Sequence, residues 1–104
     1  MKRVIGGKIF NTETAEEICE LPCHYYRSDF QWHETVLYRT KRGAYFLAGS
    51  GGPASRWARP EGSNGHSSGR GLETITKDEA RMYAESAELS PEKMIEAGFE
   101  LEEG

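Results

Sequence analysis

Cysteine and histidine side chains gather in one short part of the sequence, and both residue types can bind metal or perform covalent chemistry. Four of them lie within fifteen residues: Cys19, Cys23, His24 and His33. Structural zinc sites prefer pairs of ligands at C-x2-C spacing, whereas Pro22 interrupts the longer step between Cys19 and Cys23. We therefore expect neither a metal nor another cofactor, and we expect Cys19 to behave as a small buried hydrophobic residue.

A nucleophile could be assembled from Cys23 with His33 as its base and Asp29 to orient that base. No local signature of a cysteine enzyme surrounds these three residues. The many C-terminal carboxylates are spread along a predicted solvated helix and do not form an acid and base pair. The sequence thus predicts a protein that is not an enzyme, and a hydrolase or transferase remains only as a third hypothesis.

Glycine is concentrated between Leu47 and Gly71, which contains seven of the chain's 12 glycines. The segment follows a predicted strand, as a phosphate-binding loop would. It lacks the Lys-Ser/Thr pair and the long following helix that a nucleotide loop needs. The sequence argues against nucleotide binding, although a backbone nest at Gly51 and Gly52 could hold one anionic group.

Arginine flanks tryptophan inside this segment, at Arg56, Trp57 and Arg59. Such a cluster is typical of contacts with a nucleic-acid base or a protein partner. The alternative is that the indole folds back onto the sheet and closes the core. We expect Arg42, from the preceding hairpin, to lie beside the cluster and to complete a basic candidate site.

Charge is divided unevenly along the chain, whose net charge is −4. Residues 1–71 carry ten Lys/Arg and seven Asp/Glu, whereas residues 72–104 carry three and ten. We expect a strong dipole that favours binding to a charged partner by either face. The candidate acidic residues are Asp78, Glu79 and Glu85. The alternative is an acidic tail that only aids solubility.

The elements that must position these residues alternate between strands and helices. Gly6-Gly7 predicts a hairpin of Lys2–Ile5 and Lys8–Phe10, and the capping-box spacing of Thr14 and Glu17 predicts a helix from Thr14 to Leu21. An aromatic connector, residues 23–33, is expected to cover the core.

The central segment predicts a second hairpin, Thr35–Thr40 with Ala44–Gly49, that pairs with the first one. Gly71–Ile75 is predicted to add a further strand, after which Thr76 and Glu79 form a second capping box. Ser90 and Pro91 begin a last short helix that Gly98 ends.

The order of elements predicts an α+β fold, in which a small antiparallel sheet built from two hairpins is covered by two to three short helices. We expect one domain, 1–104, with residues 1–61 and 71–98 as its ordered body. Residues 62–70 are predicted to be a flexible loop and 99–104 an acidic tail. The predicted core residues are Ile5, Phe10, Ile18, Leu37, Phe46 and Tyr83. No run of apolar residues is long enough to span a membrane, and we expect a cytoplasmic protein.

Three segments resemble a family of small proteins from plasmids, prophages and other mobile elements of Gram-positive and gut bacteria. They are Gly7–Ile18, Leu37–Ala58 and Ile75–Glu85, and Lys41–Trp57 is the most specific part. The chain is similar in this setting to anti-CRISPR proteins. Residues 62–70 are richer in serine and glycine than the family pattern, so no role is carried over to them.

The resemblance implies an inhibitor that binds a CRISPR effector, Cas9 foremost, or its guide RNA, and acts inside the host bacterial cell. The acidic helix could occupy the effector's nucleic-acid channel, or the basic cluster could hold RNA. The alternative is a small nucleic-acid-binding accessory protein of plasmid or phage maintenance. No membrane partner is expected.

Overall fold

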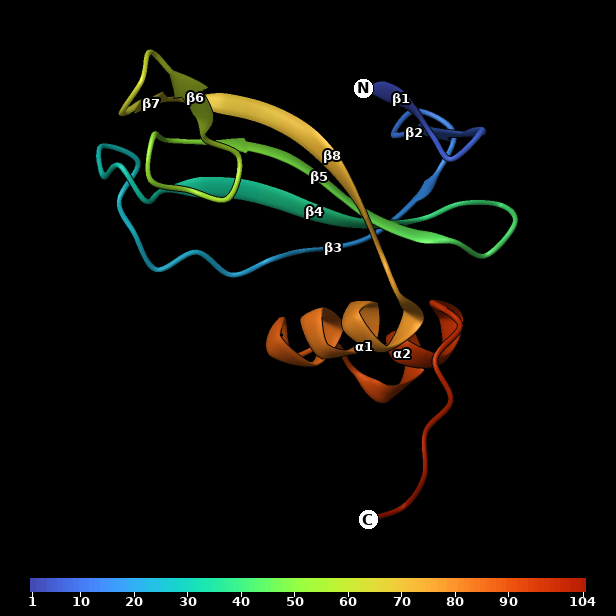
Figure 1. Ribbon diagram of the computed structural model, residues 1–104. Helices are drawn as coiled ribbons and strands as arrows, with labels where there is room; N and C mark the ends of the chain where they lie inside the picture. The colour runs from blue at the N-terminus through green and yellow to red at the C-terminus, as the bar shows by residue number, and fades with distance from the viewer.

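The computed structural model describes residues 1–104 and contains eight strands and two helices (Figure 1). In chain order they are β1 (Lys2–Ile5), β2 (Lys8–Asn11), β3 (Glu16–Glu20), β4 (His33–Arg39), β5 (Tyr45–Gly51), β6 (Arg59–Glu61), β7 (Gly65–Ser67), β8 (Gly69–Ile75), α1 (Lys77–Ser86) and α2 (Pro91–Glu96). Antiparallel sheets with two short helices confirm the predicted α+β class. Neither helix has the length and apolar composition needed to cross a membrane.

The central sheet has four antiparallel strands in the order β3-β4-β5-β8. The predicted hairpin of β4 and β5 is confirmed. Its register pairs Thr35 with Gly49 and Arg39 with Tyr45. Strand alternation sends Leu37 and Tyr38 to opposite faces of the sheet. Each face therefore has its own core.

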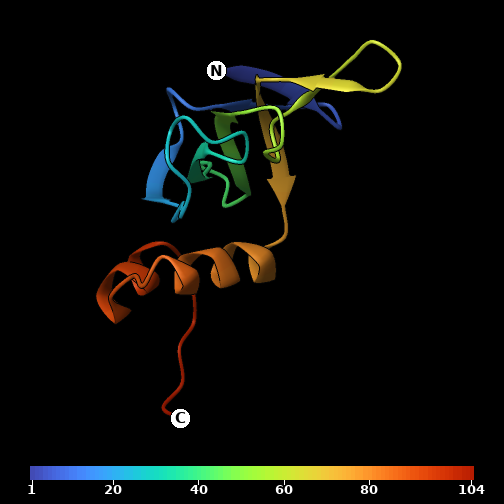
Figure 2. The ribbon, with the colours of Figure 1, turned by 90° about the vertical axis from the view of Figure 1, so that its left-hand side faces the viewer.

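The helices cover one face of this sheet, and the β1–β2 hairpin covers the other (Figures 1 and 2). Ten buried residues form the core on the helical side. They are Leu21, Leu37, Tyr45, Leu47, Trp57, Ala80, Ala84, Met94, Ala97 and Phe99. On the other side Phe10 meets Phe46 edge to face at 5.6 Å, and Tyr38 stacks on Phe46 at 5.0 Å. The domain is thus a three-layer stack with the sheet in the middle.

The predicted core is confirmed in its main features. Phe10, Leu37 and Phe46 are buried. The other three predicted residues, Ile5, Ile18 and Tyr83, are partly buried and pack against the two clusters.

The N-terminal hairpin forms as predicted, but its predicted pairing with the central hairpin is wrong. β1 and β2 make a separate two-stranded sheet. The hairpin packs through the side chain of Phe10 on the face of the central sheet, and Arg3 Nη1 donates to the Leu72 carbonyl at 2.9 Å. The place beside β4 is taken by β3.

The predicted helix from Thr14 to Leu21 is wrong, because residues 16–20 form β3. Thr14 does not cap a helix; its hydroxyl donates to the Asn11 carbonyl at 3.4 Å, and the Asn11 side chain accepts from the Glu13 amide. These local bonds make a turn. The following residues then gain backbone pairing with β4, which outweighs the helical propensity of their glutamates.

The aromatic connector does not cover the core, contrary to the prediction. Tyr25, Tyr26 and Phe30 are 45%, 88% and 70% exposed. Two short turns, in which the Asp29 amide donates to the Tyr26 carbonyl and the Trp32 amide donates to the Asp29 carbonyl, hold the connector at the edge of the domain.

The C-terminal elements follow their local signals closely. Thr76 and Glu79 form the predicted reciprocal capping box at the start of α1, and Ser90 caps α2 with Pro91 in its first turn. Gly98 adopts a φ of 96° where α2 ends, as the prediction requires. Phe99, which the sequence assigns to the tail, is 3% exposed, so the acidic tail begins after it.

The predicted flexible loop, residues 62–70, lies partly in strands. β6 and β7 form a small exposed hairpin, and residue 69 begins β8. The flexibility of this segment stays a prediction.

Candidate partner-binding surface

Glycine forms a flat floor on the helical face of the sheet. β5 and β8 each carry alternate glycines, and their register pairs Gly49 with Gly71 and Gly51 with Gly69. A Cβ atom on Gly71 would lie 3.0 Å from Cε3 of Trp57. The missing side chains therefore make room for the indole ring.

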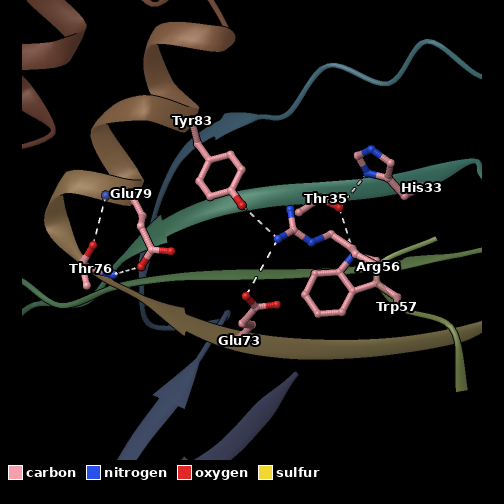
Figure 3. A network of polar contacts seen from close by, with 8 residues as sticks. All are labelled: His33, Thr35, Arg56, Trp57, Glu73, Thr76, Glu79 and Tyr83. Atoms are coloured by element: carbon pink, nitrogen blue, oxygen red, sulfur yellow. Dashed lines mark hydrogen bonds and ion pairs between the residues drawn. The ribbon is translucent and has the colours of Figure 1, made fainter.

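Trp57 is anchored on this floor by a buried hydrogen bond (Figure 3). Its Nε1–H donates to Thr35 Oγ1 at 2.9 Å, and Oγ1 lies 2.8 Å from His33 Nδ1. Thr35 is 0% exposed and Trp57 7% exposed. Trp57 is thus a core residue, which is the alternative left open by the sequence, and it presents no free ring face to a partner.

Arg56 joins three elements around the same point (Figure 3). Its Nη2 donates to the Tyr83 hydroxyl at 3.0 Å and lies 3.8 Å from Glu73 Oε1. The guanidinium also lies over the rings of Tyr83 and Trp57, at 5.3 and 5.7 Å from their centroids. These contacts connect the glycine-rich segment to α1, so Arg56 serves the packing of the domain.

The predicted basic cluster is divided in the structure. Arg42 lies in the turn that connects β4 to β5, whereas Arg56 follows the other end of β5. The prediction that Arg42 lies beside Arg56 is therefore wrong. Arg59 is exposed on β6, and it is the one arginine of the Arg-Trp-Ala-Arg cluster without an ion pair or a hydrogen bond from its side chain.

The predicted acidic residues share one helix but differ in their contacts. Asp78 lies 3.9 Å from Arg81 in an exposed ion pair. The Glu79 carboxylate accepts from the Thr76 amide at 2.9 Å, and the hydrogen bonds to Thr76 lower the pKa of Glu79. Glu85 is exposed and makes no such contact. Glu79 therefore stabilises the helix end, and Glu85 is available to a partner.

The outer surface of the helices, which we call the acidic helical layer (α1, α2 and the residues that follow each), combines carboxylates with apolar side chains. Met82 and Ile95 are 60% and 62% exposed. Met82 borders a hollow of about 210 Å³ together with Glu79, Tyr83 and Ser86. The exposed carboxylates of the two helices and their link are Asp78, Glu79, Glu85, Glu88, Glu92 and Glu96.

The residues of the enzyme hypothesis do not assemble into a catalytic arrangement. The imidazole of His33 contacts Thr35, and only the backbone amide of His33 reaches the Cys23 sulfur, at 3.5 Å. The Asp29 carboxylate accepts from the Gln31 amide at 2.7 Å. The structure contains no group of three or more His, Cys, Asp or Glu side chains placed to hold a metal ion.

The surroundings of His33 predict that the stability of the domain depends on pH. Burial, and secondly the positive charge of Arg56, lower the pKa of His33 from its ordinary value of 6.5. The unfolded chain therefore takes up a proton first as pH falls, so the free energy of unfolding should decrease below pH 6.5 until the lowered folded pKa is passed. Urea denaturation across this range measures the effect. His33→Gln should remove this pH dependence of the unfolding free energy, and His66→Gln, on exposed β7, should retain it. Equal pH dependence in the unmodified protein and both variants would contradict the assignment to His33.

The alternation of glycine on β5 and β8 is the signal that sequence reasoning missed. Gly-Ser-Gly at 49–51 and Gly-Arg-Gly at 69–71 both place glycine at every second residue, which on a strand means one face. The contacts of Arg56 with Glu73 and Tyr83 carry no comparable signal. Comparison with protein-family models, curated proteins and solved structures finds no match.

Proposed function

We propose that this protein is a non-enzymatic inhibitor that binds a CRISPR effector, Cas9 foremost, through its acidic helical layer. The class of partner rests on the resemblance to mobile-element proteins that include anti-CRISPR proteins. The observation that carries the choice of surface is the exposed Met82 between carboxylates of the same helix. Residues 78, 82 and 85 share one side of α1.

Most carboxylates of the acidic helical layer are not neutralised within the domain. Its two ion pairs, Arg81 with Asp78 and Lys77 with Glu100, are both 3.9 Å long, and both acidic side chains are highly exposed. Exposed pairs of this kind contribute little to stability. The layer therefore keeps a negative potential that a basic protein surface can use.

Such a surface suits a channel that normally holds nucleic acid. The arginines and lysines of that channel are arranged to bind phosphates, and carboxylates one helical turn apart can compete for them. Met82 adds a flexible apolar contact at the centre of the patch. Occupation of the channel would prevent guide or target binding.

The nucleic-acid-binding alternative depended on one basic site made of Arg42, Arg56 and Arg59. In the structure, Arg42 and Arg56 lie beyond opposite ends of β5, and the Arg56 side chain is packed against Tyr83. We therefore propose the acidic surface and not the basic one.

A charge-reversal experiment tests the surface. Asp78→Lys/Glu85→Lys should weaken binding to purified Cas9 by at least about tenfold, because like charges would then face each other across the interface. Binding is measured by isothermal titration calorimetry and inhibition by the rate of target cleavage. Glu79 is left intact because it caps α1.

The matched control is Glu13→Lys/Glu61→Lys. Both residues are exposed and lie outside the acidic helical layer, and the change in net charge is the same. The control should bind Cas9 nearly as well as the unmodified protein. Equal loss in both variants would mean that net charge alone governs binding. If Arg59→Ala weakened binding and the charge reversals on α1 did not, the site would move to the β6–β7 hairpin.

A further inference from the structure

A groove runs along β2 on the side away from the acidic helical layer. It has a volume of about 530 Å³ and is bordered by residues 7–11, by Thr14 and Ala15, and by residues 40–42. No residue of β1 borders it. The groove therefore follows the edge of β2 that β1 does not occupy.

That edge offers unpaired backbone groups. β2 pairs only with β1, and Ile5 faces Lys8 across the Gly6-Gly7 turn, whose φ angles are 59° and 75°. A two-residue turn of this type joins a hydrogen-bonded pair, and such pairs alternate with non-bonded ones. The N–H and C=O of Ile9 consequently point away from β1, and neither takes part in a turn or loop hydrogen bond.

The charge of the groove is entirely positive. Lys8, Lys41 and Arg42 border it and no carboxylate does. The three are exposed, and the ion pairs of the structure involve other residues. The exposed side chain of Ile9 adds apolar surface, being 65% exposed.

We propose that this groove binds an extended acidic segment of a partner protein, which adds to β2 as a further strand. Ile9 offers one backbone donor and one acceptor, the pair that another extended backbone requires. The cations select acidic side chains on the segment. A nucleic acid fits less well, because the groove's one aromatic residue, Phe10, is 6% exposed and offers no ring for a base to stack on.

This site is independent of the proposed function, since β2, which borders the groove, lies on the opposite side of the sheet from the helices (Figures 1 and 2). Its loss would leave the acidic helical layer intact. Failure of either proposal therefore leaves the other standing.

Fluorescence anisotropy with the full chain tests the proposal. The probe is a fluorescein-labelled nonapeptide that alternates Glu and Val. We expect saturable binding that weakens by at least about tenfold in Lys41→Glu/Arg42→Glu. The matched control, Lys77→Glu/Lys93→Glu, makes the same charge change on the helical side and should shift the dissociation constant less than twofold.

Two further arms separate strand addition from simple charge attraction. N-methylation of alternate peptide residues blocks backbone pairing and should weaken binding, and the Ile9 amide signal should shift on addition of the unmodified peptide in a nitrogen-15 NMR titration. Equal binding of methylated and unmodified peptide, or no binding up to millimolar concentration, overturns the proposal. Tighter binding of a decauridylate that is lost in Lys41→Glu/Arg42→Glu also overturns it and makes the groove a nucleic-acid site.

Discussion

Trp57→Ala is expected to lower the free energy of unfolding by about 3–5 kcal/mol, the range for removing a large buried aromatic side chain. The indole is 7% exposed and rests on Gly71, which has no side chain that could move in to fill the space. Its loss also removes the hydrogen bond to Thr35 Oγ1. Urea denaturation measures the change.

Trp57→Phe separates the two contributions. It keeps most of the apolar volume and removes the Nε1–H donor, so we expect a smaller loss of about 1–3 kcal/mol. A loss below about 1 kcal/mol for Trp57→Ala would contradict the core role and restore Trp57 as a candidate contact residue.

Gly69→Ala should destabilise the domain by about 1–3 kcal/mol or more, because it inserts a methyl group into a filled space. The new Cβ would collide with the backbone carbonyl oxygen of Trp57, and it would lie 2.8 Å from Cγ of Arg59. A backbone atom cannot move aside as the end of a flexible side chain can. Thermal and urea denaturation both report the loss.

Ser68→Ala is the matched control, one residue away and exposed. It should change the free energy of unfolding by less than about 0.5 kcal/mol, as most surface substitutions do. An equally small effect of Gly69→Ala would show that Gly69 is not closely packed against the backbone of Trp57.

Signals that act between near neighbours could be predicted from the sequence. Thr76 and Glu79 form their capping-box hydrogen bonds within one helical turn. The alternation of side chains along β4 and β5 likewise reflects one pair of adjacent strands. The segment after Thr14 carried the same kind of local signal, yet it became β3 because pairing with β4 is a long-range interaction that local spacing does not encode.

The candidate site was predictable in its charge but not in its geometry. The acidic residues lie where the sequence concentrates them, on α1 and beyond. The separation of Arg42 from Arg56 depends on the direction of β5. The partner of Arg56, Tyr83, lies 27 residues away in sequence, so only the packing of α1 against the sheet brings the two together.

Binding to Cas9 free of RNA is the measurement that tests the proposed function most directly. The purified protein is added to RNA-free Cas9, and guide RNA is then titrated as a competitor. Because the acidic helical layer is proposed to occupy the channel of the nucleic acid, we expect a complex without RNA that guide RNA displaces. Binding that requires guide RNA, and that disappears on nuclease treatment, would contradict the proposal.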